Sequence, residues 1–179
     1  MRRAGRQRSL GDRDRRAPGP RPSRLRTHRA GGGGRLSDLP DLQRFRDAQS
    51  GGTYERALAE LRAGSKTGHW IWFVFPQLDG LGHSPTARHY AIQSLQHARR
   101  YAADPVLGPR LRDCFQALLD LPASATAEDV LGSVDAMKLR SCATLFAHSG
   151  DDTAVAVLSR FYDGSEDGAT LRLLASAAG

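Results

Sequence analysis

Apolar residues recur every three or four positions from about residue 41 to the end of the chain, a spacing typical of helices with one buried face. Tyr54, Leu58 and Leu61, for example, stand at i, i+4 and i+7 before Gly64. Further stripes of this kind are Ile92, Leu95 and Ala98; Leu111, Phe115, Leu118 and Leu119; Leu139, Cys142, Ala143 and Phe146; and Ala154, Leu158, Phe161 and Tyr162. The pattern predicts a compact, single-domain, all-α bundle of about seven or eight short helices.

Residues that favour helix starts precede several of these stripes. The predicted starts are a cap at Thr53, a cap at Ser84 ahead of Pro85, a capping box of Thr126 with Asp129, a start at Ser133, and a cap at Asp151 or Asp152. Asp104-Pro105 and Gly108-Pro109 are expected to interrupt the chain ahead of Leu111, because proline lacks a backbone N–H. A last short helix is predicted around residues 171–174.

The segment from Trp70 to Phe75 is apolar at six consecutive positions and holds four of the twelve aromatic residues. A segment that is apolar on every side has to be buried, and six residues are too few to span a bilayer. Its alternating bulky residues also fit a buried strand, but the sequence offers no second strand to pair with it. We therefore predict a helix at the centre of the core.

The net charge of +7 would by itself indicate a nucleic-acid-binding protein. The charge is unevenly distributed, however, because residues 1–36 hold twelve Arg and two Asp, a net +10, which leaves residues 37–179 at −3. The Arg/Gly/Pro-rich tail, residues 1–36, has too few apolar residues to form a core and is predicted to be disordered. Residues 37–179 are predicted to form the single folded domain.

Three interpretations of the tail stay open. A basic arm would bind the phosphates of nucleic acid, although nothing in the domain supplies base recognition. A transit peptide fits the arginines but not Asp12, Asp14 or the glycine run of residues 31–34. We favour a mis-annotated start, upstream of the true one in a GC-rich genome, since the chain has 24 Arg and only two Lys, Lys66 and Lys138.

Cysteine and histidine usage points away from disulfides and metals. Cys114 and Cys142 are the only cysteines and are far apart, so no disulfide framework is predicted. The histidines of the domain lack metal-ligand spacing. Together with the lack of a membrane-spanning apolar run, this composition favours a cytoplasmic protein. We expect no metal, no cofactor and no membrane contact, and nucleic acid only through the tail.

Six blocks along the domain form an ordered pattern. They are Asp41-Leu42-Gln43-Arg44-Phe45 with Asp47-Ala48-Gln49, Tyr54-Glu55-Arg56-Ala57-Leu58, the run from His69 to Gln77, Gly80-Leu81-Gly82 with Ser84, the run from Pro105 to Leu111, and Lys138-Leu139-Arg140-Ser141 with Thr144-Leu145-Phe146. Together they resemble the bacterial domain-of-unknown-function family 1810 (DUF1810) over residues 39–175. The resemblance implies a compact all-α domain that begins just ahead of Asp41, and no established activity, substrate or cofactor. His97 and Asp104 depart from the residues that relatives often show there.

A ligand site is predicted around the turn formed by residues 80–84. Its glycines allow backbone N–H groups to converge ahead of a helix capped by Ser84, where an anion is favoured. Lys138 lies on an apolar helical face within reach of Asp135. The candidate ligand-binding residues are His69, Trp70, Trp72, Gln77, Gly80, Gly82, Ser84, Arg88, Lys138 and Arg140.

These residues indicate two alternative functions. The first is a pocket for an anionic or nucleotide-like small molecule, with tryptophan rings available for stacking. The second is a non-enzymatic interaction module whose exposed aromatic edge meets a partner protein. Each residue also has a structural explanation: Ser84 caps a turn, the tryptophans pack in the core, and Lys138 extends along the core edge. The sequence assigns no reaction, so enzyme status is left open.

Overall fold

Ten helices follow one another in residues 41–177, the part of the chain that the computed structural model describes. They are α1 (Gln43–Ala48), α2 (Thr53–Arg62), α3 (Ile71–Val74), α4 (Pro85–His89), α5 (Leu95–Ala103), α6 (Leu107–Leu119), α7 (Ala127–Leu131), α8 (Ser133–Ser149), α9 (Asp152–Tyr162) and α10 (Gly168–Ser176). The described residues contain no strand, only an isolated bridge between Leu78 and Ile92. The all-α prediction is confirmed, with ten helices in place of seven or eight. The predicted tail lies outside the described residues, and the domain start at residue 37 stays a prediction.

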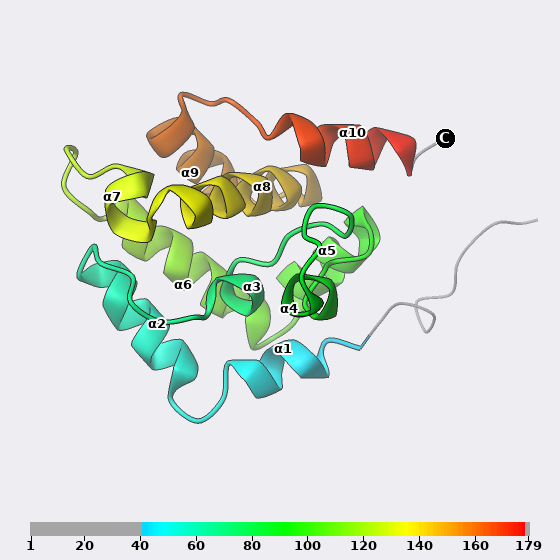
Figure 1. Ribbon diagram of the computed structural model, residues 1–179, viewed down its shortest axis with the longest axis horizontal. Coiled ribbons are helices and arrows are strands. Elements are labelled where there is room, and N and C mark those ends of the chain that lie inside the picture. The colour runs from blue at the N-terminus through cyan, green and yellow to red at the C-terminus, as the bar shows by residue number, and fades with distance from the viewer. Residues whose placement is uncertain (1–40, 178–179) are drawn as a thin grey trace, which may run out of the picture. The chain divides into compact units, whose positions relative to one another are not determined.

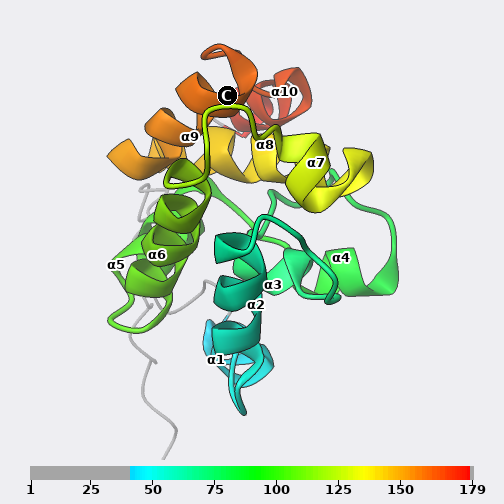
Figure 2. The same ribbon diagram turned by 90° about the vertical axis from the view of Figure 1, so that its left-hand side faces the viewer.

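Helix α8 is the centre of the arrangement in Figure 1, and it packs against α5, α7, α9 and α10. Helix α6 contacts α2, α5 and α9, while α3 contacts both α1 and α6. In the view of Figure 2, α7 to α10 lie above α1 to α4. The segment between α2 and α5 contains only the short helices α3 and α4. It lies beside α8 in both views, and this neighbourhood forms the cavity described below.

The core is built around five fully buried aromatic residues, Phe45, Phe75, Tyr101, Phe115 and Phe146. Phe75 and Phe115 stack with their ring centroids 5.2 Å apart. Tyr101 meets Phe45 and Phe146 edge-on, with centroid distances of 5.2 and 5.5 Å. Aromatic pairs of these geometries contribute about 0.5 to 1.5 kcal/mol each beyond their buried area. The rings therefore join α6 to the segment that follows α3, and α5 to α1 and α8.

The helix predicted in the apolar segment is confirmed as a single turn, α3. Ile71 and Val74 are buried, whereas Trp72 is only half-buried. The turn ends at Phe75, whose backbone is no longer helical (φ −117°, ψ 71°). Phe75 precedes Pro76, and the proline ring disfavours a helical conformation in the residue before it. The proline thus limits α3 to four residues.

Most of the predicted helix starts are confirmed. The observed caps include Ser84 for α4, the Thr126/Asp129 capping box for α7, and Asp151 for α9. The cap predicted at Thr53 is wrong, because Gly52 holds the N-cap position of α2 with a left-handed backbone (φ 82°) and Thr53 is the first helical residue. Glycine adopts that conformation without steric penalty, so the backbone turn precedes the threonine.

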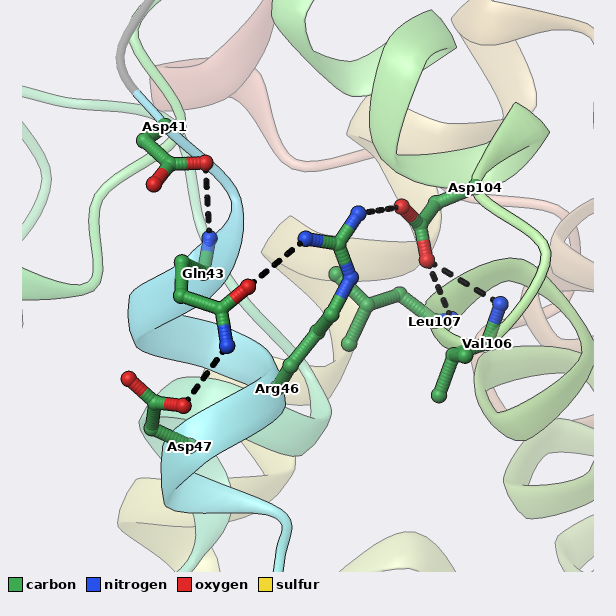
Figure 3. Close-up of polar contacts among 7 residues, drawn as sticks. All are labelled: Asp41, Gln43, Arg46, Asp47, Asp104, Val106 and Leu107. Atoms are coloured by element: carbon green, nitrogen blue, oxygen red, sulfur yellow. Dashed lines mark hydrogen bonds and ion pairs between the residues drawn. The ribbon is translucent and has the colours of Figure 1, made fainter.

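The interruption predicted at Gly108-Pro109 is also wrong, because α6 begins at Leu107 and continues through both residues. Pro109 is the third residue of the helix, where the backbone N–H has no intrahelical partner, so proline removes no hydrogen bond there. Asp104 supplies the start signal instead. Its Oδ1 accepts hydrogen bonds from the N–H groups of Val106 and Leu107, each at 3.0 Å (Figure 3).

Asp104 also joins the start of α6 to α1. Its Oδ2 contacts the guanidinium of Arg46, which in turn donates to the side-chain oxygen of Gln43 at 3.1 Å (Figure 3). Burial alone would raise the pKa of Asp104, but the bonds from Arg46 and from two backbone N–H groups lower it below its usual range. Asp104 is therefore a charged structural residue.

His97 is fully buried on α5. Its Nδ1 accepts a hydrogen bond from the N–H of Gln93 at 3.1 Å, while Nε2 has no partner among the described residues. Burial, with the nearby positive charges of Arg44 and Arg100, lowers the pKa of His97 to about 4. The imidazole is therefore neutral at neutral pH.

None of the described helices combines the length and the apolar character needed to cross a bilayer. Cys114 and Cys142 are both buried and are not joined by a disulfide. Burial raises the pKa of the Cys114 thiol to about 12, so this thiol is protonated and unreactive at neutral pH.

Candidate functional site

A cavity of about 430 Å³ lies between the segment 72–87, the first half of α8 and the start of α10. Its size falls within the range of small-molecule sites, about 300 to 1,000 Å³. The lining combines apolar side chains with a few polar groups: Trp72, Gln77, Leu81, Gly82, His83, Ser84, Ala87, Val134, Met137, Lys138, Ser141, Asp167 and Ala169. This mixture is typical of sites that hold an organic ligand by its apolar body and orient it by a few polar contacts.

A larger cavity, of about 770 Å³, lies between the loop at Leu78, the start of α5 and α10. Its lining is mainly aliphatic, and Asp79 and His148 are the only ionisable side chains in it. None of the candidate residues predicted from the sequence lines this cavity. We place the candidate site in the smaller cavity because Lys138, which belongs to a cluster of charged residues, lines it.

That cluster joins the only two lysines of the chain to one carboxylate. Lys138 Nζ donates to Asp135 Oδ1 at 2.9 Å, and Lys66 Nζ lies 2.7 Å from Asp135 Oδ2. The side chains are largely buried, with exposed fractions of 22% for Lys138, 9% for Lys66 and 16% for Asp135. The pairing of Lys138 with Asp135 predicted from the sequence is present, and Lys66 joins it from the loop after α2.

Each lysine also lies over a tryptophan ring. Lys66 Nζ is 5.1 Å from the ring centroid of Trp70, and Lys138 Nζ is 4.7 Å from that of Trp72. Cations at these distances are attracted by the negative face of an aromatic ring. Burial would raise the pKa of Asp135, but the two lysines outweigh it and lower the pKa below its usual range. Two ammonium groups therefore share one carboxylate, and the cluster carries a net charge of +1.

The two tryptophans have different roles. Trp70 is buried, and its Nε1 donates to Glu60 Oε2 at 2.8 Å. The same oxygen accepts the N–H groups of Thr67 and Gly68, also at 2.8 Å. Burial of Glu60 would raise its pKa, but these hydrogen bonds hold it at about 2. Trp70 thus belongs to a network that fixes the loop before α3, while Trp72 lines the cavity.

The turn at residues 80–84 is shaped by packing. A Cβ on Gly82 would lie 2.4 Å from the Cβ of Ala87, so only glycine fits at this close approach. Ser84 Oγ accepts the N–H of Ala87 at 3.1 Å. Helix α4 has only five residues, so the summed dipole at its N-terminus is small. The positive charge at the cavity therefore comes from Lys138 and not from the turn.

Half of the ten candidate residues line this cavity: Trp72, Gln77, Gly82, Ser84 and Lys138. The other five lie outside its lining: His69, Trp70, Gly80, Arg88 and Arg140. His69 and Arg88 are exposed side chains. Gly80 packs under Leu173, since an added Cβ would lie 3.3 Å from that side chain. Arg140 is turned toward the loop between α9 and α10, where it donates to Ser165 O at 2.9 Å and to Glu166 O at 3.1 Å.

Comparison with known proteins places the chain in a family. The sequence profile of DUF1810, described as a protein of unknown function, matches residues 39–174. The chain belongs to the DUF1810 family. It is similar to a solved structure, the conserved hypothetical protein Rv1873 from Mycobacterium tuberculosis, with 45% sequence identity and a TM-score of 0.73. The match covers 75% of this chain and 96% of that chain. No functionally curated protein matches the sequence.

Several residues that line the cavity of this DUF1810 domain were missed by the sequence analysis. Asp167 is the most informative, because it adds a negative charge to the wall. Its spacing to Thr170 is that of a helix cap, but local spacing does not show that α10 begins beside α8. Val134 and Met137 were overlooked as lining residues because they lie on the exposed side of α8, with exposed fractions of 58% and 63%.

Proposed function

We propose that the DUF1810 domain binds a small molecule in the 430 Å³ cavity, and that an anionic group of the ligand pairs with Lys138. The observation that carries the proposal is the cluster of Lys66, Asp135 and Lys138, which brings one uncompensated positive charge to the wall. A charge-assisted hydrogen bond to an ammonium group is about twice as strong as a neutral one.

The cluster is suited to an exchange of partners. When a ligand anion takes the ammonium of Lys138, Asp135 keeps Lys66 at 2.7 Å as its counter-ion. Without Lys66, such an exchange would leave a largely buried carboxylate unpaired, which costs several kcal/mol. The second lysine therefore lowers the cost of moving the first one toward a ligand.

The apolar part of the lining supports a ligand with an organic body. Trp72, Leu81 and Met137 line the same cavity as Lys138. Nucleotide-like ligands fit this description, with a phosphate at Lys138 and the base against the apolar wall. We propose binding without a chemical step, because both hydroxyl groups of the lining are engaged in structural bonds. Ser84 Oγ accepts the N–H of Ala87, and Ser141 Oγ donates to Met137 O at 3.2 Å and is also a partner of the Asp167 carboxylate.

A thermal-shift experiment on the full chain tests this proposal, with adenosine monophosphate, glucose 6-phosphate and hexanoate as probes. A probe at about 100 times its Kd should stabilise the protein by about 2.7 kcal/mol, or roughly 5 to 10 °C. Lys138→Gln should abolish the shift, whereas Arg88→Gln, an exposed residue outside the lining, should leave it unchanged. Equal shifts in the wild type and Lys138→Gln would refute the assigned role of Lys138.

The exposed side chains of Val134 and Met137 favour a second candidate function, the non-enzymatic interaction module. These two residues are among the four exposed large hydrophobic residues of the described chain, and they lie next to each other on α8. A second copy of the chain docked on this face would bury them. Analytical ultracentrifugation should then show concentration-dependent dimers that Met137→Asp abolishes, and a monomer at every concentration would exclude this candidate.

A further inference from the structure

Asp167 places a negative charge on the wall of the same cavity as Lys138. The residue is held firmly: its backbone N–H donates to Thr144 Oγ1 on α8 at 2.8 Å, and its Oδ2 accepts the N–H and the hydroxyl of Thr170, at 2.8 and 2.6 Å. Burial would raise the pKa of Asp167, but hydrogen bonds from Thr170, Ser141 and the N–H of Ala169 outweigh it and lower the pKa. The carboxylate is therefore ionised at neutral pH.

The charges around the cavity then balance. Lys66 and Lys138 are matched by Asp135 and Asp167. The nearby Arg140 is left out of this balance because it lines a different cavity, and its guanidinium donates to the hydroxyl of Ser165 and to the backbone oxygen of Glu166. A ligand with several negative charges would find one cation and would face the carboxylate of Asp167. A ligand with one negative and one positive charge meets a partner for each.

From this arrangement we infer that the ligand is a small zwitterion, with a carboxylate at Lys138, a protonated amine at Asp167 and an apolar body against Trp72 and Met137. The inference rests on the proposed function and narrows it from anionic molecules in general to amino-acid-like ones. Both bonds from Thr170 fall on Oδ2 of Asp167, and Ser141 and the N–H of Ala169 are further partners of the carboxylate. An ammonium group of the ligand would bond to Oδ1 in competition with Ser141, and the helix cap at Oδ2 would stay in place.

Calorimetric titration of the full chain with matched probes tests the inference. Norleucine carries both charges, hexanoate only the carboxylate and hexylamine only the amine, on chains of the same length. We expect norleucine to bind roughly five- to tenfold more tightly than hexanoate, because it forms a second charge-assisted contact. 6-Aminohexanoate, with its charges further apart, reports which spacing fits the two residues.

Two variants assign the contacts. Asp167→Asn should remove the advantage of norleucine over hexanoate, and asparagine still caps α10 so that the fold is kept. Lys138→Gln should weaken both carboxylates. Glu166→Gln is the matched control, because it makes the same charge change one residue away, at a side chain that pairs with His148 and does not line the cavity. It should leave every affinity unchanged.

The outcomes separate this inference from the proposed function. If hexanoate or adenosine monophosphate binds at least as tightly as norleucine and 6-aminohexanoate, in a manner sensitive to Lys138→Gln but not to Asp167→Asn, the zwitterion inference is wrong and the proposed function is kept. If no probe binds at millimolar concentration, both are overturned. The comparison among probes on the wild-type chain remains decisive if a variant does not fold.

Discussion

Lowering the pH from 8 to 5 is expected to destabilise the protein through one buried side chain, His97. Its Nδ1 accepts the N–H of Gln93, so a proton on Nδ1 would set two donors against each other. Arg44 and Arg100 add positive charge nearby, and burial is the largest contribution to the lowered pKa of about 4. The folded protein therefore resists protonation of a group that the unfolded chain protonates readily.

The magnitude follows from the two pKa values. The pKa of His97 is about 4 in the folded protein, whereas that of a solvent-exposed histidine is 6.5. Because the folded pKa is lowered, the contribution of His97 is fully present above pH 6.5 and declines as the pH falls toward 4. The loss should reach about 2 kcal/mol at pH 5 and about 3.4 kcal/mol well below pH 4. Carboxylates with lowered pKa, such as Glu60 and Asp104, lose their contribution only below about pH 4.5.

Urea denaturation at half-unit steps between pH 8 and pH 5 measures this dependence. The matched variant is His97→Asn, whose side-chain oxygen can accept the N–H of Gln93 but does not titrate in this range. The variant should be less stable at pH 8, because it leaves a small cavity, and its free energy of unfolding should change about 2 kcal/mol less than that of the wild type. Parallel pH profiles for the two proteins would show that His97 is not the group responsible.

Three further predictions concern the core and the site. Phe75→Ala should lower the free energy of unfolding by about 3 to 5 kcal/mol in urea denaturation. Trp72→Ala should lower it less, because Trp72 is only half-buried, and should also weaken ligand binding. Equal losses of stability in the two variants would contradict the difference in burial. Glu60→Gln should lower the free energy of unfolding by about 1 to 3 kcal/mol and should speed hydrogen exchange of the Gly68 amide. An unchanged exchange rate would show that Glu60 does not fix the loop before α3. Asp135→Asn should lower the melting temperature more than Lys138→Gln does, because it leaves two largely buried ammonium groups without their carboxylate. The reverse order would refute the conclusion that the two lysines share Asp135.

Local rules predicted the features that depend on neighbours in sequence. The caps at Ser84 and Asp151 and the pairing of Lys138 with Asp135 follow from spacings of a few residues, and all are present in the structure. Thr53 failed as a cap because the flexible glycine before it takes the turn. The interruption predicted at Gly108-Pro109 was wrong because Pro109 lies in the first turn of α6, where proline does not break a helix.

The composition of the site depended on contacts that local rules do not contain. Lys66 reaches Asp135 from a loop far away in sequence, and Asp167 reaches the cavity because α10 packs on α8. Arg140 was a candidate ligand contact, but it stands two residues from Lys138, and a helix turns such neighbours to different sides. The charge balance of the cavity therefore became visible only in three dimensions.

The convergence of both lysines on Asp135 has a practical consequence for amine chemistry. Lys66 and Lys138 are the only ε-amino groups of the chain, and both lie in one ion cluster with largely buried side chains. Apart from the α-amino group, reagents that acylate, methylate or cross-link amines can therefore react only at this cluster. Labelling of Lys138 should slow when its cavity is occupied, so that mass spectrometry of one peptide becomes a direct footprint of the site.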